Sequence, residues 1–208
     1  MILQAKNITH LYGNEKALDD VHFEAKRGEF IALVGESGSG KSTLLSILSS
    51  LLKPTTGELY FDGTPFNTIQ NIDTFRQREV GFIFQFHYLI NYLTVKENIL
   101  LAAHDVDMAH YEALLKQCGI EEIQHKYPDQ ISGGQRQRSA IVRALINQPK
   151  IIFADEPTGN LDSRNSQAIY ELFRALCNEG VTLIVATHDT VLASYADTIT
   201  KVHDGKIL

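Results

Sequence analysis

Residues 30–52 read FIALVGESGSGKSTLLSILSSLL, and this stretch decides the fold. It opens with a short, uninterrupted apolar run from Phe30 to Val34, which is typical of a strand buried on both faces. Its second half predicts a helix with one apolar face, made by Leu44, Leu45, Leu48, Leu51 and Leu52. A buried strand is therefore expected to lead through a glycine-rich turn into a helix.

The turn itself fits the phosphate-loop pattern G-x-x-x-x-G-K-[ST] at every fixed position. Its glycines let successive backbone N–H groups point at one phosphate, and the helix N-terminus adds partial positive charge there. Lys41 can reach the β- and γ-phosphates, and the Ser42 hydroxyl can hold Mg²⁺. A chance glycine-rich turn is the alternative, and the flanking strand and helix argue against it. We therefore expect a nucleoside triphosphate to contact Gly35, Ser37, Gly38, Ser39, Gly40, Lys41, Ser42 and Thr43.

Composition narrows the class of protein. The chain has 208 residues, enough for one large domain, or a core with one subdomain. Its net charge of −6 argues against a nucleic-acid partner. Cys118 and Cys177 lack metal-site spacing, and no apolar run is long enough to cross a membrane. We expect a soluble cytoplasmic protein that reaches any membrane through a partner.

The order of strand and helix signals indicates an α/β fold with a helical insert. Short antiparallel strands are expected up to residue 30, with alternation clearest at Val21, Phe23 and Ala25. Helices dominate from about Leu93 to Leu145, including one capped by Thr94 and one over 108–118. The remaining expected elements are strands over 57–63, 80–84, 151–154, 181–186 and 198–202, a helix over 166–177 and a terminal hairpin turn at 204–205.

Two further segments have residues suited to binding charged groups, one for an anion and one for a cation. Residues 131–138 read ISGGQRQR before a helical pattern, and a Ser cap followed by glycines is an anion-binding device as well as an ordinary cap. Residues 151–156 read IIFADE, an apolar strand ending in two carboxylates. There Asp155 can hold the Mg²⁺ shell, and Glu156 is a candidate base for water. The alternative for the pair is solvated acids at a strand end.

Together these motifs resemble the nucleotide-binding subunit of an ATP-binding cassette (ABC) transporter, over essentially the whole chain. They fall in the family's order: Tyr12, the phosphate loop, Gln85, the signature at 131–135, Asp155-Glu156, Asn160-Leu161-Asp162 and His188. The resemblance implies a P-loop NTPase core, with a RecA-like mixed sheet and an antiparallel β subdomain, plus a helical subdomain. The expected division of this single domain, 1–208, is a core of 1–85 and 141–208 and a helical subdomain of 86–140.

The resemblance also implies roles for individual residues. Tyr12 would stack on the adenine of ATP, and Gln85 would sense Mg²⁺ and the attacking water. His188 would contact the γ-phosphate, and Asp162 would communicate across a dimer. Catalysis is thus expected from Glu156, His188, Gln85 and Lys41, and Mg²⁺ binding from Ser42, Gln85 and Asp155.

In this family the signature of one subunit closes over the ATP held by another. Ser132, Gly133, Gly134 and Gln135 are therefore expected to act on the nucleotide of a second copy of the chain. The other implied partner is an integral-membrane permease at the inner face of the cell membrane. Residues 156–162, EPTGNLD, resemble the lipoprotein-releasing, macrolide-export and antimicrobial-peptide-resistance branch.

Two other functions remain open on these grounds. One is a soluble ABC ATPase acting on a non-transport partner, which usually carries two cassettes or a long coiled coil. The other is a scaffold that binds ATP without turnover, which the presence of Glu156 and His188 disfavours.

Overall fold

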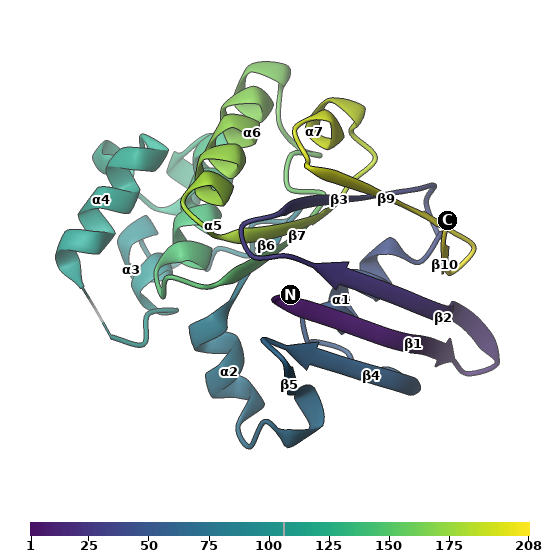
Figure 1. Cartoon of the computed structure of the whole chain (residues 1–208). Coiled ribbons are helices and arrows are strands. Elements are labelled where there is room, and N and C mark those ends of the chain that lie inside the picture. Colours follow the sequence, from purple (N-terminus) through teal and green to yellow (C-terminus); the bar gives the residue numbers. More distant parts are fainter. Residues whose placement is uncertain (106) are drawn as a thin grey trace.

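The computed structural model describes residues 1–105 and 107–208 as two β-sheets flanked by helices (Figure 1). The larger sheet has six strands in the order β10-β9-β3-β8-β7-β6. Its strands run parallel except for β10, which pairs antiparallel with β9. The smaller sheet has four antiparallel strands in the order β2-β1-β4-β5. The expected α/β class, with a mixed sheet and an antiparallel β subdomain, is confirmed.

The elements have the following bounds. The strands are β1 Leu3–Tyr12, β2 Glu15–Ala25, β3 Phe30–Val34, β4 Thr56–Phe61, β5 Thr64–Pro65, β6 Val80–Phe84, β7 Ile151–Asp155, β8 Thr182–Ala186, β9 Thr198–His203 and β10 Lys206–Ile207. The α-helices are α1 Lys41–Leu48, α2 Ile72–Glu79, α3 Val95–Leu100, α4 Met108–Cys118, α5 Gly133–Leu145, α6 Ser163–Asn178 and α7 Thr190–Ser194, and the short 3-10 helices are η1 Phe66–Thr68, η2 Glu121–Ile123 and η3 Pro128–Gln130.

Local sequence explains most of these bounds. Strand β3 is buried along most of its length, as its apolar run predicts. In β2 the residues Val21, Phe23 and Ala25 are buried and alternate with exposed neighbours. Helix α4 begins after Asp107, whose side chain accepts two backbone N–H groups, and ends at Gly119 in the left-handed region.

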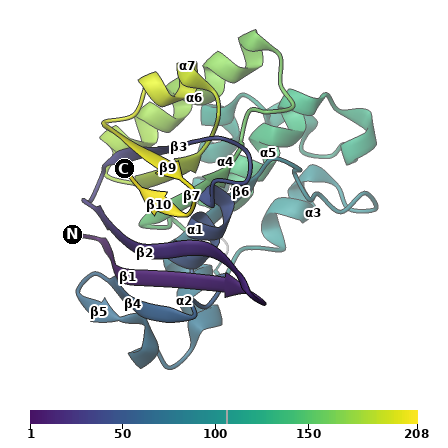
Figure 2. The same cartoon turned by 90° about the vertical axis from the view of Figure 1, so that its right-hand side faces the viewer.

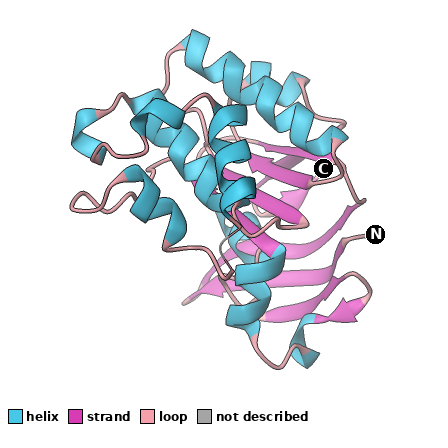
Figure 3. Cartoon of the chain, turned by 90° about the vertical axis from the view of Figure 1, so that its left-hand side faces the viewer, coloured by secondary structure: helices cyan, strands magenta, loops and turns pink. Residues whose placement is uncertain are grey.

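Helix α1 lies between the two sheets (Figure 2). Its buried leucines pack with residues of both sheets in one hydrophobic cluster. The opposite face of the larger sheet is covered by α5 and α6, whose apolar residues form a second cluster with those of α3 and α4. Figure 3 shows these helices on one side of the strands. The parallel sheet is thus buried on both faces, which leaves its strand ends to form a site.

One expectation needs correction, and one helix has no signal in the sequence pattern. Helix α1 ends at Leu48 and does not reach Leu52, because Ser50 adopts a left-handed backbone (φ 65°) that breaks the helix. Helix α2 was not expected, since its sequence is strongly polar and has no apolar stripe; it begins at the capping residue Asn71. The division into a core and a helical subdomain stays a prediction.

Candidate active site

The phosphate loop joins the end of β3 to the start of α1 and requires glycine at two places. A Cβ at Gly35 would lie 2.1 Å from the carbonyl oxygen of Val202, so no side chain fits there. Gly40, the residue before α1, has a φ of 102°, a conformation that other residues rarely adopt. The loop therefore packs tightly against β9 and leads directly into α1.

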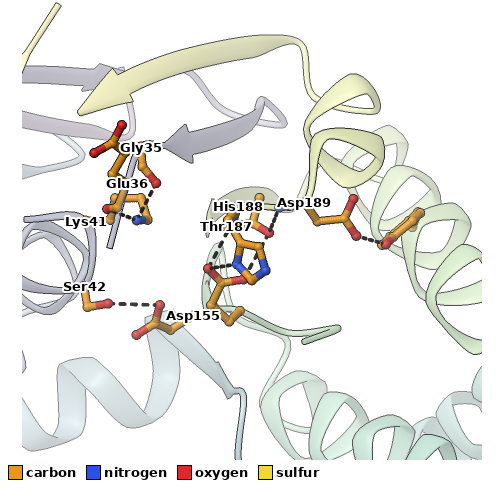
Figure 4. Close-up of polar contacts among 10 residues, drawn as sticks. Gly35, Glu36, Lys41, Ser42, Asp155, Thr187, His188 and Asp189 are labelled. Carbon is orange, nitrogen blue, oxygen red and sulfur yellow. Dashed lines mark hydrogen bonds and ion pairs between the residues drawn. The ribbon is translucent and has the colours of Figure 1, made fainter. Parts of the chain in front are cut away.

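Lys41 lies inside this loop. Its Nζ donates to the carbonyl oxygens of Gly35 and Glu36, each at 2.8 Å, and the residue is only 9% exposed (Figure 4). A buried ammonium needs such acceptors to compensate for lost hydration. The contacts hold the positive charge where the loop's backbone N–H groups converge, which suits a phosphate.

Ser42 and Asp155 meet across the foot of the site. The Ser42 hydroxyl donates to Asp155 Oδ1 at 3.2 Å, which joins the first turn of α1 to the end of β7 (Figure 4). Burial raises the pKa of Asp155, and the nearby Glu156 raises it further, whereas the Ser42 hydrogen bond lowers it. A hydroxyl and a partly desolvated carboxylate are hard oxygen ligands, which fit the one or two protein ligands that Mg²⁺ takes beside phosphates.

Glu156 and His188 form the other half of the site. His188 Nδ1 lies 2.7 Å from Glu156 Oε1, and the His188 backbone N–H donates to the same oxygen at 3.1 Å. The Thr187 hydroxyl donates to the second carboxylate oxygen at 3.3 Å. Glu156 itself has a φ of 45°, a strained backbone of the kind that clusters at active sites. The carboxylate of Glu156 is thus held in one orientation by the turn after β8.

An open cleft of about 910 Å³ connects these groups. Its lining brings together ten of the residues expected from the sequence: Tyr12, Ser37, Gly38, Gly40, Lys41, Ser42, Thr43, Gln85, Glu156 and His188. Of the remaining loop residues, Ser39 is buried with an Oγ that has no partner among the described residues. Ser39 is not among the described residues that line the cleft: a Cβ at Gly35 would lie 2.7 Å from its Oγ, and its N–H donates to the Glu36 carbonyl oxygen at 3.2 Å.

Several cleft residues were not expected. Glu15, Lys16 and Ala17 come from the start of β2, and Asp204 and Gly205 come from the terminal hairpin. Sequence pattern gives no signal for them, because only tertiary packing brings the two turns together. A Cβ at Gly205 would lie 2.7 Å from the Ala17 carbonyl oxygen, which shows how closely these turns pack.

The signature segment forms the capped N-terminus of α5. Ser132 Oγ accepts the Gln135 backbone N–H, and Gln135 Oε1 accepts the Ser132 backbone N–H, at 3.2 and 2.9 Å. Gly134 is buried against the side chain of Asn165. In the described part of the chain, the cleft lining includes none of Ser132, Gly133, Gly134 and Gln135. The chain does not bring its own signature to its own phosphate loop.

The site combines a phosphate loop at the carboxyl edge of a parallel sheet with a paired serine and aspartate for a cation, and a glutamate held beside a histidine. Together with the capped signature segment at the start of α5, this combination is that of an ATP-binding cassette. Residues 18–159 match the family described as "ABC transporter", and the chain belongs to that family. It is an ABC ATPase.

Relatives that match over nearly their whole length support this assignment. The chain is 42% identical to the candidate hemin import ATP-binding protein HrtA of Staphylococcus epidermidis, over 100% of this chain and 99% of that protein. It is 38% identical to the lipoprotein-releasing system ATP-binding protein LolD of Aquifex aeolicus, over 100% and 96%.

Solved structures agree with the relatives. The dimeric cassette MJ0796 superposes with a TM-score of 0.89 at 39% identity, covering 99% of this chain and 96% of that one. The same cassette is also known as a dimer in a post-hydrolysis state with ADP and Pi (TM-score 0.88, 37% identity, covering 99% and 96%). In residues 1–105 and 107–208 of this protein, no helix is both long and apolar enough to span a membrane.

Proposed function

We propose that this ATPase works as a pair of identical chains that closes on ATP and opens after hydrolysis, and that it thereby drives a separate membrane-spanning permease. One observation carries the proposal. The capped signature helix presents an anion site, yet that site does not line the chain's own nucleotide cleft. A second copy, related by a two-fold axis, would supply the ATP that this site needs.

Each cleft would bind ATP through the residues that line it. Tyr12 is 54% exposed at the cleft rim, where its ring meets that of His10 at 81° (centroids 4.7 Å apart), and its exposed part would stack on an adenine. The loop N–H groups and Lys41 would hold the phosphates, with Lys41 exchanging its two carbonyl acceptors for phosphate oxygens. Ser132 and Gly134 of the second copy would cover the γ-phosphate from the other side.

Hydrolysis would depend on a few placed side chains. Glu156, oriented by the Thr187 hydroxyl and the His188 backbone N–H, would accept a proton from the attacking water. His188 would turn from Glu156 toward the γ-phosphate when ATP binds. Ser42, Asp155 and Gln85 would hold Mg²⁺, which supplies charge neutralisation for the phosphates. Separation of the charged products would then release the two copies.

A groove at the edge of the sheet is suited to a permease segment. It has a volume of about 470 Å³ and lies along β6, where Val80, Phe82 and Phe84 meet Leu101 and Ala102. In this lining Leu101 is 67% exposed. Exposed apolar side chains around a groove favour a partner helix. Docking there would hold the chain at the inner face of the membrane. The permease segment would then lie beside the expected helical subdomain, residues 86–140.

The branch is proposed to be an extrusion type that moves lipid or peptide cargo outward. The segment EPTGNLD over 156–162 supports this, together with the relative described as a lipoprotein-releasing ATP-binding protein. A soluble ABC ATPase acting on a non-transport partner is the alternative. Co-purification with a membrane protein distinguishes the two.

The test is the Glu156→Gln variant. We expect it to bind ATP normally, lose most turnover and accumulate as an ATP-bound dimer in size-exclusion chromatography. Glu179→Gln is the matched control, since Glu179 is the C-cap residue that follows α6 and is not among the described residues that line the cleft. It should keep turnover and show no trapped dimer. A Glu156→Gln chain that stays monomeric with ATP and hydrolyses it at the normal rate would refute the proposal.

A further inference from the structure

The loop that carries Gln85 leaves the end of β6 and has no regular structure before α3. Arg143 on α5 holds it from one side. Its Nη2 donates to the carbonyl oxygen of His87 at 2.7 Å, and its Nη1 donates to that of Tyr88 at 2.8 Å. The rigid fork of a guanidinium is suited to two acceptors at once, whereas an ammonium offers a point charge.

Two amide side chains hold the same loop nearer to Gln85. Asn160 Nδ2 donates to the Gln85 carbonyl oxygen at 3.2 Å. Gln137 Oε1 lies 2.5 Å from His87 Nδ1, and Gln137 Nε2 lies 3.5 Å from the Phe84 carbonyl oxygen. The Gln85 loop is therefore fixed by side chains rather than by a backbone ladder.

Arg143 is an unusual residue for a purely structural role. It is half-buried, and in the described part of the chain it has no carboxylate within ion-pair distance. Burial lowers its pKa. A charge placed there costs hydration energy that an apolar residue would not lose. The hydrogen bonds to the two carbonyl oxygens offset this lost hydration energy.

The same helix carries the signature. Helix α5 runs from Gly133 to Leu145 beside β6, with the cap Ser132 at its beginning and Arg143 in its last turn (Figure 1). The hydrogen-bonded backbone of this 13-residue helix physically connects the signature at one end with Arg143 near the other. Arg143 and Phe84 also line the groove at the sheet edge that is proposed above for the permease segment.

We propose that Arg143 is a positioning residue for Gln85: it ties the Gln85 loop to the signature helix, so that the two take up their working positions together. The proposal rests on the role proposed above for Gln85. Arg143 touches neither nucleotide nor reacting atoms, and it acts only through the loop that it holds.

The first experiment compares Arg143→Gln with Arg138→Gln, a half-buried arginine on the same helix with no hydrogen bond to the loop among the described residues. For Arg143→Gln we expect kcat to fall about 10- to 100-fold, since misplacing a catalytic group by about 1 Å has that effect. The dissociation constant of monomer for ATP should stay within about twofold. Backbone amides of 84–90 should exchange hydrogen faster, and those of the phosphate loop should not. Arg138→Gln should change none of these.

The second experiment separates positioning from general damage. In a Gln85→Ala background, Arg143→Gln should cause no further loss of kcat, because the group that it positions is gone. If Gln85→Ala is impaired and the two losses multiply, the positioning role of Arg143 is wrong. If Gln85→Ala keeps full turnover, the proposed role of Gln85 is wrong, and this inference fails with it. Should Arg143→Gln not fold, Arg143→Lys applies the same test, because an ammonium cannot replace the guanidinium's fixed two-carbonyl fork.

Discussion

Replacing Ser132 by alanine separates two roles of the signature cap: its contribution to folding stability and its contribution to ATP turnover. Within the chain, its Oγ accepts one N–H at the start of α5 at 3.2 Å. Losing an N-cap hydroxyl costs about 1 kcal/mol of folding free energy. In a domain of this size that lowers the melting temperature by about 2–4 °C. The structural part of the effect is therefore small.

The functional part should be much larger. In the proposed pair, the Ser132 hydroxyl donates to the γ-phosphate bound by the other copy, and a hydrogen bond to a charged group contributes roughly 1.5–3 kcal/mol. Its loss should lower turnover roughly 10- to 150-fold. ATP binding to the monomer should not change, because Ser132 does not line the cleft of its own chain in the described residues.

Thr94→Ala is the matched control. Thr94 caps α3 with the same reciprocal arrangement, accepting the Glu97 N–H and donating its own N–H to the Glu97 carboxylate. The melting temperature of this variant should fall at least as far, because the Thr94 hydroxyl also donates to the Glu97 carboxylate at 2.7 Å, and its turnover should stay complete. Steady-state ATPase assays, equilibrium nucleotide binding and melting scans measure the three quantities. The reasoning is refuted if monomer binding of ATP collapses in Ser132→Ala, or if Thr94→Ala loses turnover equally.

Two more variants test the cleft. Asp155→Asn should abolish Mg²⁺-dependent turnover yet raise the melting temperature of the nucleotide-free chain at neutral pH. Because the folded-state pKa of Asp155 is raised, ionising it destabilises the fold as the pH rises through that value, and the gain should shrink in acid. Melting scans in EDTA at several pH values check this, and a less stable variant at neutral pH would contradict it. Tyr12→Ala should raise KM for ATP about 5- to 150-fold, from a stacking free energy of about 1–3 kcal/mol. Tyr12→Phe should not raise it, and an equal effect of both would exclude stacking.

The chain's local patterns are sufficient to predict the elements that build the site. The apolar runs of β3, β6 and β7 and the capped helices α3 and α4 lie where the sequence places them. These segments have strong, self-contained signals: a continuous apolar run, a capping residue, or a terminal glycine. The motif order then predicts which strand ends must meet.

The rest depends on contacts that no local pattern contains. Helix α2 has caps and terminal charges but no apolar stripe, so periodicity misses it. The contribution of Lys16 and Asp204 to the cleft follows from two distant turns packing together. In the sequence Arg143 is likewise an ordinary helix residue. Only the structure shows that its guanidinium donates to the carbonyl oxygens of His87 and Tyr88.

Lys41 has a consequence for the speed of the cycle. Two of the three N–H donors of its ammonium donate to peptide oxygens, so for these two hydrogen bonds ATP gains only the difference between phosphate and peptide acceptors. That difference moderates affinity and, by the same amount, eases the departure of ADP. A phosphate loop whose lysine already has acceptors binds its nucleotide with moderate affinity, which suits an ATPase that must release ADP in every cycle.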